Sequence, residues 1–329
     1  MDTTTFDAIV IGAGPAGLTA GMYLARAKAR TLILNDGTAG GQMVLTHEIA
    51  NYPGVESISG YQLATVMRNQ AKHFGCTIRT NIKITELDLD GEVKSVEVNG
   101  RDRYGARTVI LAPGGRSRTL GVPGEDRLKG KGISYCATCD GDFFQDRDII
   151  VVGGGNSALE EAVSLTKYAR SVTIVHQFDH FQAFPHAIEE AQANPKIRFV
   201  MESRIAEFIG GEALERVRIE HIPTKQLTET AIDGVFVFIG YMPNTESLHG
   251  KVALTDSGEI VVSSVLETSV PGVFAAGDAT TKRFRQITTA VADGTVSALA
   301  AMEYLRTAAA PDAHSVSAGE EEMVVQTTR

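Results

Sequence analysis

Residues 7–17 read DAIVIGAGPAG, and this stretch decides the fold. An apolar strand runs into the spacing Gly12-x-Gly14-x-x-Gly17, and the helical stretch LTAGMYLARA follows it. Glycines at this spacing allow a tight turn and let backbone N–H groups approach a pyrophosphate at the helix N-terminus. The next strand, TLIL, ends at Asn35-Asp36, where an acid can accept hydrogen bonds from ribose hydroxyls. The sequence therefore predicts an α/β dinucleotide-binding unit at the start of the chain.

The same pattern occurs a second time. Residues 148–158, DIIVVGGGNSA, give a strand and the spacing Gly153-x-Gly155-x-x-Ala158. The helical stretch LEEAVSLTKYA and the strand SVTIV follow. Two such units in one chain suggest a flavoprotein that binds FAD and handles a second nucleotide.

A third segment, residues 272–305, supports FAD. It reads as a strand ending in Gly277-Asp278, followed by a long helix. Asp278 can hold a ribitol hydroxyl, and Arg285 and Gln286 can reach the edge of the flavin ring from the helix start. This pattern predicts an α/β protein with two Rossmann-like, three-layer nucleotide-binding domains.

The FAD domain is expected to be discontinuous. It comprises residues 1–115 and 246–307, and the second domain, residues 116–245, is inserted between them. Its limits fall in the Gly/Pro-containing stretches APGGRSRTLGVPG and GYMPNTE, which suit two hinge strands. Residues 308–329 lack periodicity and contain a Glu triplet, so they are expected to form a mobile tail.

Composition narrows the function. The net charge of the 329 residues is −9, which disfavours nucleic acid as a partner. The chain has no apolar run of membrane-spanning length, and its start has no basic segment typical of a signal peptide, so a cytoplasmic location without membrane association is expected.

The three cysteines are Cys76, Cys136 and Cys139, and the last two form a C-x-x-C motif in the segment SYCATCDGDFF. A zinc site needs about four ligands, and no second pair supplies them, so redox chemistry is favoured over a metal. Two thiols this close can form a disulfide, and the adjacent Asp140 can protonate a leaving thiolate. The alternative is a pair of buried, inert cysteines.

At this point the chain resembles the low-molecular-weight thioredoxin reductases of bacteria. The matching stretches include IGAGPAGLTAGMYLARA, GGQMVLTHEIANYPG, LAPGGRSRTLGVPGE, CATCDGDFF, VVGGGNSALEEA, FVFIGYMPNT and GVFAAGDAT with RQITTAVADG. The resemblance implies a homodimeric FAD enzyme in which Cys139 faces the flavin, Cys136 faces thioredoxin and Asp140 is the general acid. It also implies a domain rotation that alternately places the dithiol on the flavin and exposes it.

Several FAD contacts rest on this resemblance, namely Gln42 and Asn51 at the flavin and the backbone near Ile82 at the adenine. The full set of residues expected to contact FAD is Gly12, Gly14, Pro15, Ala16, Gly17, Asn35, Asp36, Gly41, Gln42, Asn51, Ile82, Ala112, Gly277, Asp278, Arg285, Gln286 and Ile287. The expected second, degenerate nucleotide site consists of Gly153, Gly155, Asn156, Ser157, Ala158 and His176.

The electron donor is the point where the chain departs from the family. Relatives that use NADPH resemble HRRDxFRA where this chain reads HQFDHFQA, residues 176–183. The three arginine positions hold Gln177, Phe178 and Gln182, which carry no charge for a 2′-phosphate. The donor is therefore expected to be something other than NADPH.

Two donors remain open. NADH is allowed, although the second strand is followed by the neutral His176 and Gln177 rather than by a new acid. The glycine turn at residues 153–158 either binds a nucleotide or is kept for packing alone. The resemblance also extends to reductases that take electrons from ferredoxin. Two basic clusters can meet an acidic ferredoxin or merely form a solvated face: Arg116, Arg118, Arg127, Lys129 and Lys131, and Lys282, Arg283 and Arg285.

Other function classes share some of these features. A dithiol oxidase would use O₂ on the flavin to make a disulfide in a small molecule or peptide, and it would also lack the arginines. The CATCD motif with its acid favours reduction of thioredoxin or a similar protein disulfide. A flavin-bound redox sensor or scaffold would not need the dithiol and the acid together.

Overall fold

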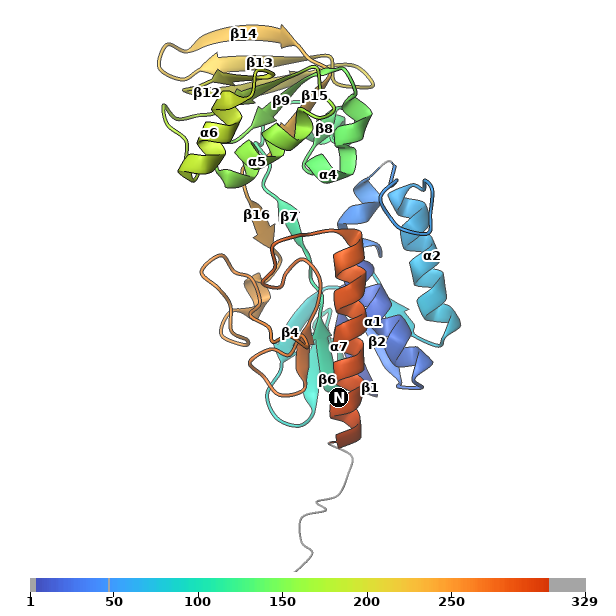
Figure 1. Cartoon of the computed structure of the whole chain (residues 1–329). Coiled ribbons are helices and arrows are strands. Elements are labelled where there is room, and N and C mark those ends of the chain that lie inside the picture. Colours follow the sequence, from blue (N-terminus) through green and yellow to red (C-terminus); the bar gives the residue numbers. More distant parts are fainter. Residues whose placement is uncertain (1–3, 47, 308–329) are drawn as a thin grey trace, which may run out of the picture.

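The structure is a computed structural model that describes residues 4–46 and 48–307, and it contains two lobes joined by a narrow ribbon (Figure 1). We call them the first unit and the second unit. The first unit is built on a sheet with the order β3-β2-β1-β6-β5-β4, in which β17 also pairs with β6. Its strands are β1 (Thr4–Ile11), β2 (Thr31–Leu34), β3 (Thr77–Arg79), β4 (Ile84–Asp88), β5 (Lys94–Val98), β6 (Asp102–Leu111) and β17 (Val273–Ala275). Its helices are α1 (Pro15–Arg26), η1 (Gly41–Leu45), α2 (Gly60–His73), η3 (Glu246–Leu248) and α7 (Ile287–Thr307).

Alternation along the strands produces the core of the first unit. Side chains of successive strand residues point to opposite faces of the sheet. Ala8 and Val10 therefore pack against the helices, whereas Ile9 packs on the opposite face. Small residues bring α1 and α7 close together, since a Cβ on Gly294 would lie 2.3 Å from the carbonyl oxygen of Ala16. Figure 1 shows these two helices side by side.

The second unit contains a parallel sheet with the order β11-β10-β9-β15-β8. Its strands are β8 (Ile133–Ser134), β9 (Asp148–Val152), β10 (Ser171–Val175), β11 (Ile197–Val200) and β15 (Gly234–Val237). Its helices are α3 (Glu125–Leu128), α4 (Ala137–Asp140), η2 (Gly141–Phe144), α5 (Asn156–Leu165) and α6 (Pro185–Ala193). An antiparallel sheet of β12 (Ser203–Ile209), β13 (Arg216–His221) and β14 (Gln226–Ala231) packs on the face opposite α5 and α6.

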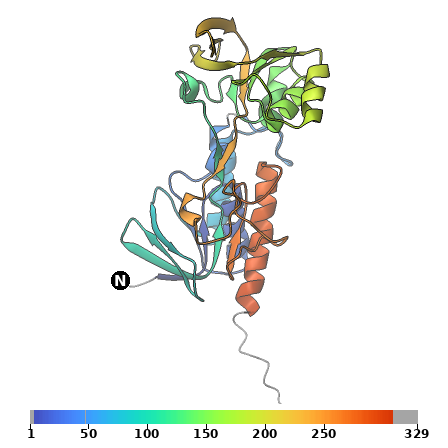
Figure 2. The ribbon, with the colours of Figure 1, turned by 90° about the vertical axis from the view of Figure 1, so that its left-hand side faces the viewer.

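The ribbon between the units consists of the antiparallel strands β7 (Gly115–Ser117) and β16 (Tyr241–Pro243), as both views show (Figure 2). Asn244 fixes its base by donating from Nδ2 to the Pro113 carbonyl at 3.0 Å. β17 lies far from β6 in sequence yet joins its sheet. The α/β class with two Rossmann-like units is thus as predicted, whereas the domain limits stay a prediction, and the expected tail at residues 308–329 lies outside the described residues.

Candidate active site

The first glycine turn is sterically tight. Gly12 has a φ of +104°, and a Cβ there would lie 2.0 Å from the Ala112 carbonyl oxygen. A Cβ on Gly17 would lie 1.9 Å from the Gly12 carbonyl oxygen. α1 begins directly after Gly14, which provides no side-chain cap, so its first N–H groups remain available to an anion. The turn therefore has the geometry that a pyrophosphate requires.

Two neighbouring segments, the start of η1 and the loop after β2, pack against this turn. A Cβ on Gly41, at the start of η1, would lie 3.0 Å from the Gly14 Cα. Asn35 accepts from the Ala13 N–H at 2.8 Å and donates to three carbonyls after β2, so its side chain stabilises the loop. Asp36 is exposed, whereas Ile82 is buried with its N–H 3.4 Å from the Asn35 carbonyl oxygen. The Asp36 carboxylate, rather than the Asn35 amide, is thus positioned to accept hydrogen bonds from a ribose.

Asp278, three residues beyond the end of β17, has a buried carboxylate oxygen, Oδ1, that makes no hydrogen bond within the part of the chain that the structure describes. Burial raises the pKa of this carboxyl, although Lys282 and Arg285 oppose the rise. A buried acceptor without a donor is costly, by about 1–3 kcal/mol. A ribitol hydroxyl of FAD would supply that donor, so this position fits the cofactor.

Replacing Asp278 by Ala is expected to weaken FAD binding by about 10–100-fold, because a hydrogen bond to a charged group contributes about 1.5–3 kcal/mol. Titration of apoprotein with FAD, followed by flavin fluorescence, measures the dissociation constant. The exposed Asp256→Asn is the control, with affinity expected to be unchanged. Equal affinities for the Asp278→Ala protein and the parent chain would remove Asp278 from the site.

The segment before α7 contacts both the ribbon and the second unit. Arg285 forms an ion pair with Glu259 and lies 4.4 Å above the Tyr241 ring in β16. Gln286 donates from Nε2 to the Thr138 hydroxyl at 3.0 Å. Glu259, Tyr241 and Thr138 were not identified from the sequence. Both Arg285 and Gln286 therefore already have protein partners in addition to any contact with a flavin.

The C-x-x-C motif forms a disulfide. Cys136 and Cys139 are bonded, with their Cα atoms 5.3 Å apart at the short helix α4. Asp140 accepts from the Ser134 hydroxyl at 2.6 Å, and the same Ser134 oxygen accepts from the Cys136 N–H at 3.1 Å. Burial raises the pKa of Asp140, whereas the Ser134 hydrogen bond lowers it. Ser134 is a further residue that the sequence did not single out.

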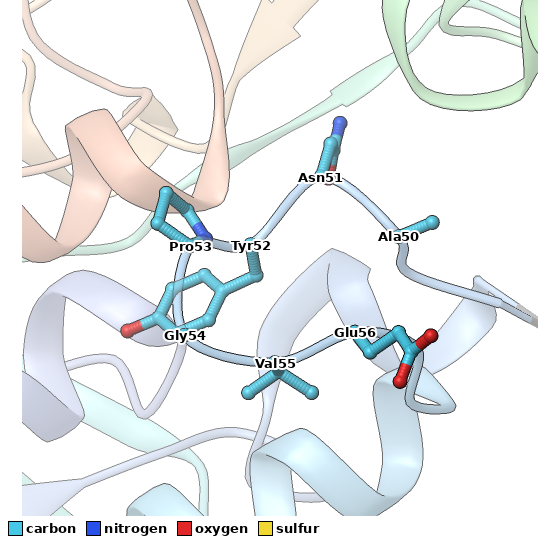
Figure 3. A pocket seen from close by; sticks show the side chains of 7 residues that line it. All are labelled: Ala50, Asn51, Tyr52, Pro53, Gly54, Val55 and Glu56. Atoms are coloured by element: carbon cyan, nitrogen blue, oxygen red, sulfur yellow. The ribbon is translucent and has the colours of Figure 1, made fainter.

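Two cavities adjoin Asn51, and the smaller of them lies where the disulfide segment faces the first unit. The larger, about 510 Å³, is lined by residues 50–56, and Figure 3 shows the Asn51 and Val55 side chains leaving this loop on opposite sides. The smaller, about 100 Å³, is bounded by Asn51 on one side and by Thr138 and Cys139 on the other. Asn51 also donates to the Thr138 carbonyl at 3.4 Å. The disulfide thus lies against the loop that was expected to contact the flavin.

The second glycine turn is closely covered by the segment after β10. The ring of His176 is buried, and a Cβ on Gly154 would lie 2.3 Å from it. The Gln182 N–H donates to the Gly154 carbonyl at 2.8 Å, and the Phe184 N–H donates to Asn156 Oδ1 at 2.7 Å. Gln177 and Gln182 are exposed, and Phe178 is 39% exposed. None of these three positions carries a cation.

The basic clusters are partly neutralised within the chain. Lys282 forms an ion pair with Asp293, and Arg285 pairs with Glu259. Arg116 in the other cluster pairs with Glu246 at 3.2 Å. These pairings reduce the charge that either cluster can offer an acidic protein.

Among residues 4–46 and 48–307, no helix is long and apolar enough to cross a membrane. The same described ranges contain no group of three or more His, Cys, Asp or Glu side chains arranged to hold a metal ion.

Two Rossmann-like units, with a disulfide of one unit against the glycine-turn side of the other, define a nucleotide-dependent disulfide oxidoreductase. The chain belongs to the pyridine nucleotide-disulphide oxidoreductase family, whose model matches residues 6–294. It is 45% identical over 307 residues to a thioredoxin reductase of Peptoclostridium acidaminophilum, covering 91% of this chain and 97% of that protein. The enzyme is thus a thioredoxin reductase-like oxidoreductase, and the predictions of this class and of FAD as its cofactor are confirmed.

Two solved structures differ in how well they superpose. Thioredoxin reductase of Streptococcus pyogenes is 40% identical, with a TM-score of 0.89 and coverage of 93% of this chain and 100% of that one. Thioredoxin reductase of Lactococcus lactis in its FR conformation is 38% identical, covering 92% and 99%, yet its TM-score is 0.63. Identity and coverage are nearly equal, so the drop in TM-score is consistent with a different placement of the two units about the ribbon.

Proposed function

We propose that this protein is a thioredoxin reductase that passes electrons from a donor other than NADPH, through FAD and the Cys136–Cys139 disulfide, to thioredoxin or a similar protein disulfide. The observation that carries the proposal is the disulfide, flanked by the protonatable Asp140, lying against the FAD-binding unit. We also propose that it acts as a homodimer in the cytoplasm.

FAD supplies a two-electron redox centre when bound. The glycine turn would hold its pyrophosphate, Asp36 its ribose and Asp278 its ribitol. Cys139 lines the cavity next to Asn51, so its sulfur would receive the electrons. Cys136 would then leave, and later attack the disulfide of thioredoxin as the more accessible nucleophile.

Asp140 would supply a proton to a departing sulfur. Because burial raises its pKa, the carboxyl keeps its proton to a higher pH than an ordinary aspartic acid. A step that needs this protonated acid is fully active below the raised pKa and is lost as the pH rises through it.

Ser134→Ala should move the alkaline limb of the kcat/KM profile to higher pH, because the Ser134 hydrogen bond holds the pKa of Asp140 down. The profile is measured with thioredoxin as the varied substrate. Ser134→Thr keeps a hydroxyl and is the matched control. A limb that stays in place, or moves to lower pH, would exclude Asp140 as the acid.

The proposal excludes NADPH because three neutral residues stand where the 2′-phosphate would be bound. NADH and ferredoxin both remain possible donors under this proposal. The ion pairs at Arg116, Lys282 and Arg285 count against a strongly basic surface on this protein that would bind an acidic ferredoxin. The test is anaerobic flavin bleaching with NADPH, NADH and reduced ferredoxin side by side. Rapid bleaching by NADH or ferredoxin, followed by thioredoxin reduction, supports the proposal. Bleaching without thioredoxin reduction, but with peroxide formed from O₂ and a dithiol, would favour a dithiol oxidase.

A further inference from the structure

Outside the ribbon, the side-chain hydrogen bonds between the two units converge on the disulfide segment. Outside the ribbon, the side-chain hydrogen bonds that join the units in the described ranges come from Asn51 and Gln286, and they reach only Thr138 and Cys136. Thr138 lies between the two cysteines, at the start of α4. The contact is thus made at the reacting disulfide itself.

The direction of these hydrogen bonds follows from the chemistry of the atoms. Thr138 Oγ1 lies 3.5 Å from Cys136 Sγ, and a disulfide sulfur carries no hydrogen, so the hydroxyl is the donor. The Gln286 amide donates to the same Thr138 oxygen at 3.0 Å, and its nitrogen lies 4.0 Å from Cys136 Sγ. Two donors therefore form a chain from the first unit to one sulfur of the disulfide.

We propose that Thr138 is a catalytic residue that stabilises the leaving sulfur of Cys136, with Gln286 polarising and orienting its hydroxyl from the opposite unit. The inference rests on the proposed function, because it takes Cys139 as the sulfur that receives electrons. Reduction breaks the Sγ–Sγ bond with two electrons drawn from the reduced cofactor. The electron pair of that bond leaves on Cys136, and two protons, one of them from Asp140, complete the dithiol.

The two hydrogen bonds from Gln286 and Thr138 stabilise Cys136 most strongly while the disulfide bond is breaking. Negative charge appears on Cys136 as the bond breaks, and hydrogen bonds to a charged acceptor are about twice as strong as those to a neutral one. Gln286 belongs to the first unit, so the full chain exists only while the disulfide lies against the FAD side. When the units separate, Cys136 loses the Gln286 contribution and its thiolate becomes a better nucleophile towards an incoming disulfide.

The hydroxyl is tested by Thr138→Val, which keeps the branched shape, and by Thr138→Ser, which keeps the donor. Flavin is photoreduced anaerobically, and its reoxidation by the Cys136–Cys139 disulfide is followed by absorbance. We expect Thr138→Val to slow this step about tenfold and Thr138→Ser to restore it to within about twofold. Gln286→Met should slow it less, and adding it to Thr138→Val should have little further effect. Thr228→Val, on the exposed face of β14, is the control.

A second readout does not depend on turnover. In a Cys139→Ser background, alkylation of Cys136 at neutral pH should be about three- to tenfold slower with Thr138→Val, because less thiolate is present. The inference is overturned if, in the Thr138→Val variant, Cys136 is alkylated and the flavin is reoxidised at the parental rates. It is also overturned if Thr138→Ser fails to restore the rate of flavin reoxidation. A parent enzyme that reduces no thioredoxin, yet keeps these Thr138 effects, would overturn the proposed function and leave the inference standing.

Discussion

Cys139→Ser is expected to bind FAD normally and to lose at least about a thousandfold of its disulfide reductase activity. The physical reason is that the flavin no longer has a sulfur to reduce, while the glycine turn and Asp278, which we propose hold the cofactor, are untouched. Turnover is measured with thioredoxin and the donor that bleaches the flavin fastest, and FAD content is measured from the absorbance ratio of the purified protein.

Cys136→Ser should fail in a different manner. It should also block thioredoxin turnover, but the remaining Cys139 thiolate can lie against the flavin and give a charge-transfer band. Cys76→Ala is the matched control, because Cys76 is 5% exposed and burial raises the pKa of its thiol to about 12, which keeps it unreactive. Parental turnover in either active-site variant would show that the two cysteine roles are wrongly assigned.

The two glycine turns illustrate what the sequence predicts well. Gly12 and Gly17 occupy positions where a Cβ would meet a carbonyl oxygen at about 2 Å, so the backbone geometry itself requires glycine and leaves a readable pattern. Each strand, turn and helix is local in sequence. The two-unit fold follows from the same local signals.

Contacts between distant segments left no such pattern. Tyr241 and Glu259 are ordinary residue types at spacings that form no motif, and only the fold brings them to Arg285. Asn35 shows the converse, since it was among the residues expected to contact FAD and its side chain is used by its own loop. The charge of Lys282 and Arg285 could be counted from the sequence, but their acidic partners, Asp293 and Glu259, could not be assigned without the structure.

NADPH is expected to reduce this flavin at least about a hundredfold more slowly than it reduces the flavin of NADPH-dependent relatives at the same concentration. A 2′-phosphate carries nearly two negative charges, and each charge-assisted hydrogen bond from arginine contributes about 1.5–3 kcal/mol. Gln177, Phe178 and Gln182 supply no charge, so desolvation of the phosphate is not offset. Anaerobic stopped-flow bleaching across a range of NADPH concentrations measures both the apparent affinity and the limiting rate.

Restoring arginine at all three positions should recover about ten- to a hundredfold in NADPH affinity, provided that the turn at residues 153–158 still accepts a pyrophosphate. The control is Phe178→Ser, which removes the ring without adding charge and leaves Gln177 and Gln182 as they are. A gain in NADPH affinity in the arginine variant alone would assign the defect to the phosphate pocket.

No gain would mean that the His176 ring over Gly154 and the Gln182–Gly154 hydrogen bond close the turn itself. A protein donor such as ferredoxin would then be favoured over NADH. Fast bleaching of the unaltered protein by micromolar NADPH would contradict the inference from these three residues, because the phosphate would have to be bound elsewhere.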